Sequence, residues 1–141
     1  MRDLMHEIQA VPFIPPQSDA TNAVITSSII DLQGCDSITF FILTGAILDA
    51  DVTFTVQLEE GMQANMSDAA PVADIDMLSS VRGAAPEASA AFTFANPNAV
   101  TRLGYIGNLR YLQMTITPAN NTSAASIAAL AVRGHLASRP S

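Results

Sequence analysis

Apolar and polar residues alternate along several short stretches of this chain, which is the pattern of a strand with one buried face. The clearest stretch is DVTFTVQLE at residues 51–59, where every even-numbered residue is apolar and every odd-numbered residue is polar or charged. YLQMTIT at residues 111–117 alternates in the same way. ITFFIL at residues 38–43 is largely apolar on both faces, which predicts a central strand or a strand that contacts a partner.

Four further strands are predicted at residues 23–30, 91–94, 100–105 and 126–133. The last of these, SIAALAVR, has the alanine-rich composition of a helix. We nevertheless expect a strand there, because the turn-rich segment TPANNTS separates it from the strand at 111–117. The dipeptide Gly107-Asn108 is of the type that closes a tight hairpin, which predicts that Val100–Ile106 lies antiparallel to Leu109–Thr117.

Short strands separated by frequent turn signals, with no alternation of strands and helices, predict an all-β protein. We expect a compact antiparallel β-sandwich or jelly roll that forms a single domain over residues 20–136. Residues 61–86 break the pattern and are too long for an ordinary loop. They are expected to be an irregular insertion or long loop, with at most one short edge strand near Met77–Val81.

The first 19 residues differ from the rest, because a short amphipathic piece is followed by VPFIPPQSD with its three prolines. Proline blocks both a helix and a strand ladder, so residues 1–19 are predicted to be an extended N-terminal arm that packs on a neighbour. Phe13 and Ile14 are the candidate contact residues of this arm. Residues 137–141 are expected to be a C-terminal tail.

The charge balance is strongly acidic, with 13 acidic residues against 6 arginines, no lysine and a formal net charge of −7. Such a chain repels a phosphate backbone, which excludes sequence-independent nucleic-acid binding and a basic membrane-surface role. The uncharged stretch at residues 37–48 is too short to cross a bilayer as a helix, and the stretch at 111–132 contains proline and several polar residues. Asp3 and Glu7 interrupt the apolar core that a secretion signal needs, so an unexported chain is expected.

Residues that could carry chemistry are few and scattered. Cys35 is the single cysteine, which excludes an internal disulfide and a multi-cysteine zinc site. His6 and His135 lie at opposite ends of the chain, and we interpret Asp74 and Asp76 as solvated loop carboxylates. Neither a nucleotide-binding glycine pattern nor a nucleophile elbow occurs. We therefore expect no catalysis, no metal and no cofactor.

Composition favours a chain that is partly covered by other chains. Hydrophobic residues make up 49% and charged residues 13% of the sequence, and obligate interfaces are more apolar than free surface. A well-filled single core would give the same composition. Arginine and tyrosine are enriched at interface cores, and the candidate contact residues beside predicted strands are Arg102, Tyr105, Arg110 and Tyr111.

The segment Leu103–His135 resembles the C-terminal part of small structural proteins that tailed bacteriophages encode beside their major capsid protein. The resemblance consists of a strand ending Tyr-Ile-Gly-Asn, an Arg-Tyr pair, a strand ending Thr-Pro and a last strand ending Gly-His. The matching positions are Tyr105, Ile106, Gly107, Asn108, Arg110, Tyr111, Thr117, Pro118, Gly134 and His135. The chain departs from the pattern at Leu109, where these proteins often have lysine.

This resemblance implies a virion protein that is made in the host bacterial cytoplasm and binds the outer surface of the capsid as a decoration, or cement, protein. It implies the major capsid protein as partner and self-association as a homotrimer. An alternative is another virion part, such as a head–tail joining protein or the base of a head fibre. An alternative of a different class is a carbohydrate-binding β-sandwich.

Overall fold

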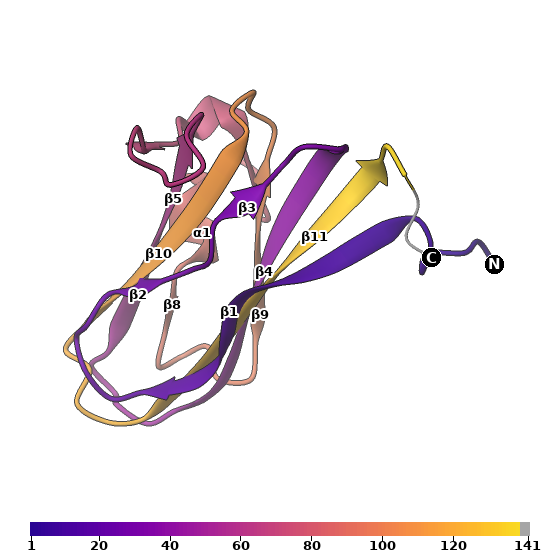
Figure 1. Cartoon of the computed structure of the whole chain (residues 1–141). Helices are drawn as coiled ribbons and strands as arrows, with labels where there is room; N and C mark the ends of the chain where they lie inside the picture. Colours follow the sequence, from indigo (N-terminus) through magenta and orange to yellow (C-terminus); the bar gives the residue numbers. More distant parts are fainter. Residues whose placement is uncertain (139–141) are drawn as a thin grey trace.

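The computed structural model describes residues 1–138 and consists of two antiparallel sheets packed face to face (Figure 1). The first sheet has the strand order β1 (Ile8–Asp19), β11 (Ala125–Leu136), β4 (Cys35–Ile47), β9 (Val100–Tyr105) and β7 (Met77–Ser79). The second has the order β2 (Ile25–Thr26), β10 (Tyr111–Ala119), β5 (Thr53–Gly61) and β6 (Ala70–Pro71), with β3 (Ile30–Asp31) also on β10 and β8 (Phe92–Thr93) also on β5. The helical segments are η1 (Asp74–Asp76) and α1 (Pro86–Ala90).

The strand order is nested, because the first strand pairs with the last and the second with the one before it. β1 lies beside β11, and β2 lies beside β10. β4 then takes its place between β11 and β9 in the first sheet, while β5 pairs with β10 in the second. This is the order of a jelly roll, and it confirms the prediction of an all-β sandwich.

Most of the predicted strands are present, with adjusted boundaries. Residues 38–43 lie inside β4, which has a neighbour on both sides as predicted for a central strand. Residues 23–30 give the two short strands β2 and β3, both of which pair with β10. The alanine-rich segment 126–133 lies within β11. The irregular stretch 61–86 contains β6, η1 and the edge strand β7, and it buries Met66 and Val72.

The predicted hairpin at Gly107-Asn108 is wrong. β9 belongs to the first sheet, where it pairs with β4 and β7, whereas β10 belongs to the second sheet and pairs with β5. Neither Gly107 nor Asn108 has the positive φ of a two-residue hairpin turn. Glycine is required there for space, because a Cβ on Gly107 would lie 2.5 Å from the Tyr105 hydroxyl. The segment therefore links the two sheets.

The N-terminal segment is extended as predicted, but most of it is a strand of the sandwich and does not stand apart as an arm. β1 pairs with β11, with shifts of register between Pro12 and Ile14 and between Ile14 and Gln17. Prolines are tolerated on an edge strand and at bulges because no ladder hydrogen bond is lost there. Only residues 1–7 precede the sheet, and they project from the body (Figure 1). Of the predicted tail, the structure describes residues 137 and 138.

The core lies between the two sheets and contains two stacked aromatic pairs. Phe13 of β1 stacks on Phe40 of β4 with 4.6 Å between ring centroids, and Phe54 of β5 stacks on Phe92 of β8 at 4.7 Å. Each buried phenylalanine stabilises the fold by roughly 1.5–3 kcal/mol relative to exposure. The short helix α1 closes one side, where the Leu58 N–H donates to the Glu87 carboxylate at 2.6 Å. Burial raises the pKa of Glu87.

Candidate functional site

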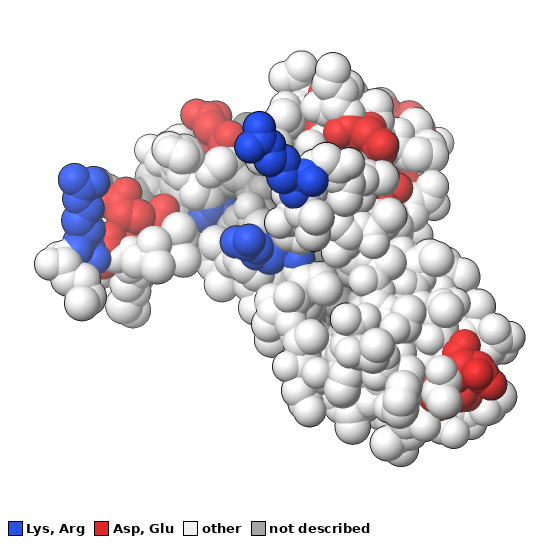
Figure 2. Space-filling model, turned by 180° about the vertical axis from the view of Figure 1, so that it is seen from behind, with Lys and Arg blue, Asp and Glu red and all other residues white. Residues whose placement is uncertain are grey.

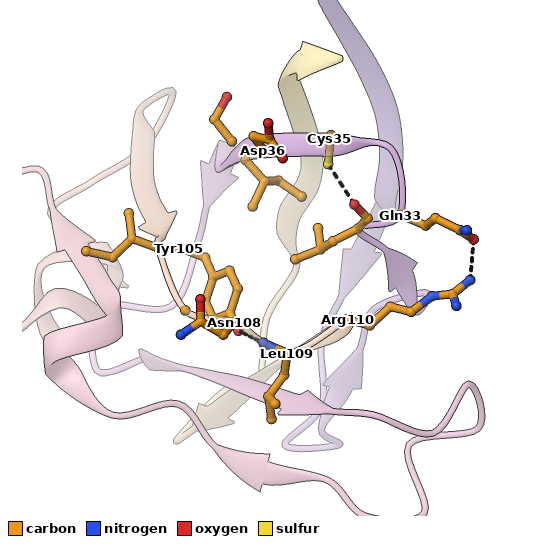
Figure 3. Close-up of a pocket in the computed structure, with 12 residues that line it drawn as sticks. Gln33, Cys35, Asp36, Tyr105, Asn108, Leu109 and Arg110 are labelled. Carbon is orange, nitrogen blue, oxygen red and sulfur yellow. Dashed lines mark hydrogen bonds between the residues drawn. The ribbon is translucent and has the colours of Figure 1, made fainter. Parts of the chain in front are cut away.

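A pocket of about 460 Å³ opens at one end of the sandwich, between the start of β4 and the link from β9 to β10 (Figure 3). The residues labelled around it are Gln33, Cys35, Asp36, Tyr105, Asn108, Leu109 and Arg110. The pocket brings together two of the candidate residues from the sequence, Tyr105 and Arg110. Their partners inside the chain decide what the pocket can do.

Tyr105 of the first sheet is hydrogen-bonded to Glu60 of the second sheet, and we call this link the inter-sheet strut. Its side chain is 4% exposed, and its hydroxyl donates to Glu60 Oε2 of β5 at 2.6 Å while accepting from the Leu109 N–H at 3.0 Å. Burial and the hydrogen bond to the Glu60 carboxylate raise the pKa of Tyr105 far above its ordinary value. The phenol is therefore neutral and fully engaged, so it is not available as a nucleophile or as a contact for another chain.

Arg110 is hydrogen-bonded to residues of the turn that precedes β4. Its Nε and Nη2 donate to the two carboxylate oxygens of Asp31 at 2.8 and 2.9 Å, and Nη2 also donates to Gln33 Oε1 at 2.5 Å. The guanidinium lies 5.1 Å from the ring centroid of Tyr111. The hydrogen bond to Arg110 holds the pKa of the Asp31 carboxyl below its ordinary value. The contacts with Asp31 and Gln33 together engage the Nε and Nη2 groups of Arg110 within the chain.

A serine and a histidine meet at the rim of the pocket. Ser37 Oγ and His135 Nδ1 are 2.8 Å apart on an exposed part of the surface. A nucleophile activated in this way also needs a third group that orients the base. Within residues 1–138, no side chain takes that role for His135. Ser37 of β4 is paired with Gly134 of β11, and a Cβ on Gly134 would lie 2.7 Å from Ser37 Oγ. We therefore interpret the Ser37–His135 hydrogen bond as a structural contact between β4 and β11.

The other titratable groups do not form a reactive site in the described part of the chain. The Cys35 thiol donates weakly to the Leu32 carbonyl at 3.4 Å. Asp74 and Asp76 lie in the short helix η1. No group of three or more His, Cys, Asp or Glu residues that could hold a metal ion is present among residues 1–138. Over the same residues, no helix is long and apolar enough to cross a membrane.

The first sheet has one side that faces away from the second sheet, and we call this side the outer face. Directly paired residues of neighbouring strands share one side of a sheet, so the register defines three rows. The central row is Arg102, Phe41, Leu130 and Pro12; the flanking rows are Gly104, Thr39, Val132 and Ala10, and Val100, Leu43 and Ala128. Arg102 is the one ionised side chain in these rows.

The outer face is apolar and open to solvent. Val100 is 58% exposed and Leu43 37%, and Leu78 on the edge strand β7 is 53% exposed. A strand spacing of about 4.8 Å and three rows of side chains give the face an area of about 400 Å². Patches of this size on single chains are often functional. Seen from behind, the molecule has a wide area without charged side chains (Figure 2).

The six candidate contact residues therefore separate into different roles. Phe13 and Ile14 are each 1% exposed and belong to the core, so their prediction as arm contacts is wrong. Tyr105 is the inter-sheet strut, while Arg110 and Tyr111 contact each other within the chain. Arg102 alone is exposed and makes no side-chain hydrogen bond to residues 1–138.

No other residue of the outer face was predicted as a contact residue, although one signal in the sequence pointed to this face. The segment at 38–43 is apolar on both sides. Its second side, with Phe41 and Leu43, forms the middle of the outer face. A comparison with known protein families found no match to this chain, and no curated protein shows significant similarity to it.

Proposed function

We propose that this chain is a structural protein of a virion, which binds the outer surface of a tailed-phage capsid and stabilises it without catalysis. The observation that carries the proposal is the outer face, an apolar surface of one sheet with a single ionised side chain, Arg102. Such a surface is unfavourable in water and is stabilised when other chains cover it. A chain with such a surface functions as part of an assembly with other chains.

The resemblance over residues 103–135 supports the same proposal at the level of the fold. Several of its residues have roles inside this chain: Tyr105 joins the sheets, Gly107 lies against the tyrosine, and Arg110 holds Asp31. A shared motif of this kind is expected in proteins that share a fold. The virion role itself depends on the resemblance together with the outer face.

The proposed mechanism is mechanical. A face of about 400 Å² is half of the roughly 800 Å² per partner that a standard stable interface buries, so one contact is weak. Many copies repeated by the symmetry of a shell give a large total, because linked weak contacts reinforce one another. The net charge of −7 suits the outer side of a shell better than the side that contacts DNA.

The absence of catalysis is part of the proposal and is supported by the pocket. Tyr105 is held as a neutral strut, and the Arg110 guanidinium is occupied by Asp31 and Gln33. The Ser37 and His135 side chains have no third group within residues 1–138 to orient the base. These contacts stabilise the end of the sandwich.

The copy number of this chain in purified virions tests the proposal. A connector ring occurs in about a dozen copies per particle, whereas a protein that covers the shell is repeated by the shell symmetry many times more. A stained gel of virions should show this chain in amounts comparable to the major capsid protein. A ratio near one to fifty would favour a head–tail joining protein or a fibre base, and binding on a glycan array without any association with particles would favour the carbohydrate-binding alternative.

A further inference from the structure

We propose that a second copy of this chain covers the outer face, through the exposed segment Asp74–Ile75–Asp76 that precedes the edge strand β7. This inference names the occupant of the outer face, and it rests on the proposed function in taking that face as an assembly surface. It follows from the unpaired cation on the outer face and from the pairing of apolar and acidic groups in η1.

Arg102 is unusual among the arginines of the sheets. Arg110 is bound to Asp31, and Arg133 donates to Gln9 Oε1 at 3.1 Å and to the Gln33 carbonyl at 2.8 Å. Arg102 has no such acceptor among residues 1–138, although it lies beside Phe41 in the central row of the outer face. Covering this guanidinium with a purely apolar surface would leave a buried unpaired charge, which is strongly unfavourable. The occupant must therefore bring a carboxylate together with an apolar group.

A second copy placed face to face does not meet this requirement. The rows of the outer face contain no acidic residue, so a symmetric contact would bring two Arg102 side chains into one apolar interface without a counter-charge. The contact must use another surface of the second copy. Contacts between two different surfaces repeat around a ring or along a filament.

The segment η1 has the complementary chemistry. Ile75 is 82% exposed, and it is flanked by Asp74 and Asp76, whose carboxylates accept no hydrogen bond from residues 1–138. An exposed aliphatic side chain between two carboxylates matches an arginine within an apolar surface. Two carboxylates also allow the bidentate geometry that arginine favours.

A hollow in the outer face has room for this segment. It lies beside Arg102, is lined also by Thr39, Leu78 and Gly104, and has a volume of about 210 Å³. This space has room for one branched aliphatic side chain. When Asp74 and Asp76 of the second copy pair with Arg102, the exposed Ile75 side chain between them would enter this hollow.

The positions of the two surfaces favour a small ring. η1 immediately precedes β7, the outermost strand of the first sheet, so it lies at an edge of the sheet whose outer face carries Arg102. An edge and a face of one sheet point in directions roughly at right angles. A contact between them, repeated by rotation, closes after about three or four copies.

Sedimentation of the purified full chain over a wide range of concentrations tests this contact. The wild type is expected to form a closed ring of three or four copies. Arg102→Glu and Asp74→Arg, each alone, should weaken association at least tenfold, and the double variant should return to within about threefold of wild type. Ile75→Ser should weaken association, whereas Val24→Ser, which changes a 54% exposed valine on another part of the surface, should not.

Arg2→Glu is the matched charge control, because it makes the same change of charge in the segment that precedes β1. Circular dichroism of each variant checks the fold, and Asp76→Arg replaces Asp74→Arg if the latter does not fold. A chain that stays monomeric, or an oligomer that Arg102→Glu leaves intact, would overturn the inference. A ring that forms as expected while the chain is absent from virions would overturn the proposed function alone.

Discussion

The strut between Tyr105 and Glu60 is predicted to be the main polar link between the two sheets at the open end of the sandwich. Tyr105→Phe keeps the ring in the core but removes the hydroxyl that donates to Glu60 at 2.6 Å and accepts from the Leu109 N–H at 3.0 Å. A hydrogen bond to a charged group contributes about 1.5–3 kcal/mol and a neutral one about 1 kcal/mol. Glu60 is partly exposed and regains water, so we expect a loss of about 2 kcal/mol in the free energy of unfolding.

Urea denaturation at neutral pH measures this loss, which corresponds to a midpoint shift of about 1 M for an m-value near 2 kcal/mol/M. Tyr111→Phe is the matched control, because the Tyr111 hydroxyl makes no hydrogen bond to residues 1–138, and it should change stability by less than about 0.5 kcal/mol. A Tyr105→Phe variant as stable as the wild type would refute the strut.

The pH dependence of the same variant gives a second check. The pKa of Tyr105 is raised in the folded chain above the ordinary value of 10.0. A raised pKa stabilises the folded state fully below the ordinary pKa, and this contribution is lost progressively as pH rises beyond it. The difference between wild type and Tyr105→Phe should therefore shrink above pH 10. The tyrosinate absorbance of Tyr105 should appear only when the protein unfolds.

Three further predictions concern the same framework. Gly107→Ala should destabilise the chain by about 2–3 kcal/mol in thermal or urea unfolding, because its Cβ would lie 2.5 Å from the Tyr105 hydroxyl; an unchanged melting temperature would contradict the close contact. Phe13→Ala should cost about 3–5 kcal/mol in the isolated chain, since Phe13 is 1% exposed; a contact residue of a free arm would leave urea unfolding unchanged. Arg110→Gln should destabilise the chain only slightly at neutral pH, as expected for an exposed pair. Because the Asp31 pKa is lowered from 3.8, this contribution is lost as pH falls below 3.8, and unfolding of the two forms should converge in acid.

Of the site, the sequence predicted the kind of surface better than its residues. It indicated that arginine, tyrosine and an apolar strand were the elements of an interface, and Arg102 and the segment 38–43 do lie on the outer face. Tyr105 and Arg110 were equally good candidates by residue type. Their partners Glu60 and Asp31 are 45 and 79 residues away along the chain, so no local pattern distinguishes an engaged arginine or tyrosine from a free one.

The alternation of apolar and polar residues by itself determined the all-β class and placed β5 and β10, because the two-residue period is a property of the strand backbone and needs no partner. The tertiary structure decided which strands pair. Gly107-Asn108 has the composition of a hairpin turn, but the buried Tyr105 and its bond to Glu60 direct the chain across to the other sheet. The prolines before residue 19 exclude a central strand but not an edge strand. Only the tertiary structure shows that this segment pairs with the edge of β11 and belongs to the sandwich. Pairing between distant strands depends on how the whole core is filled, so it is a property of the folded chain and not of any single segment.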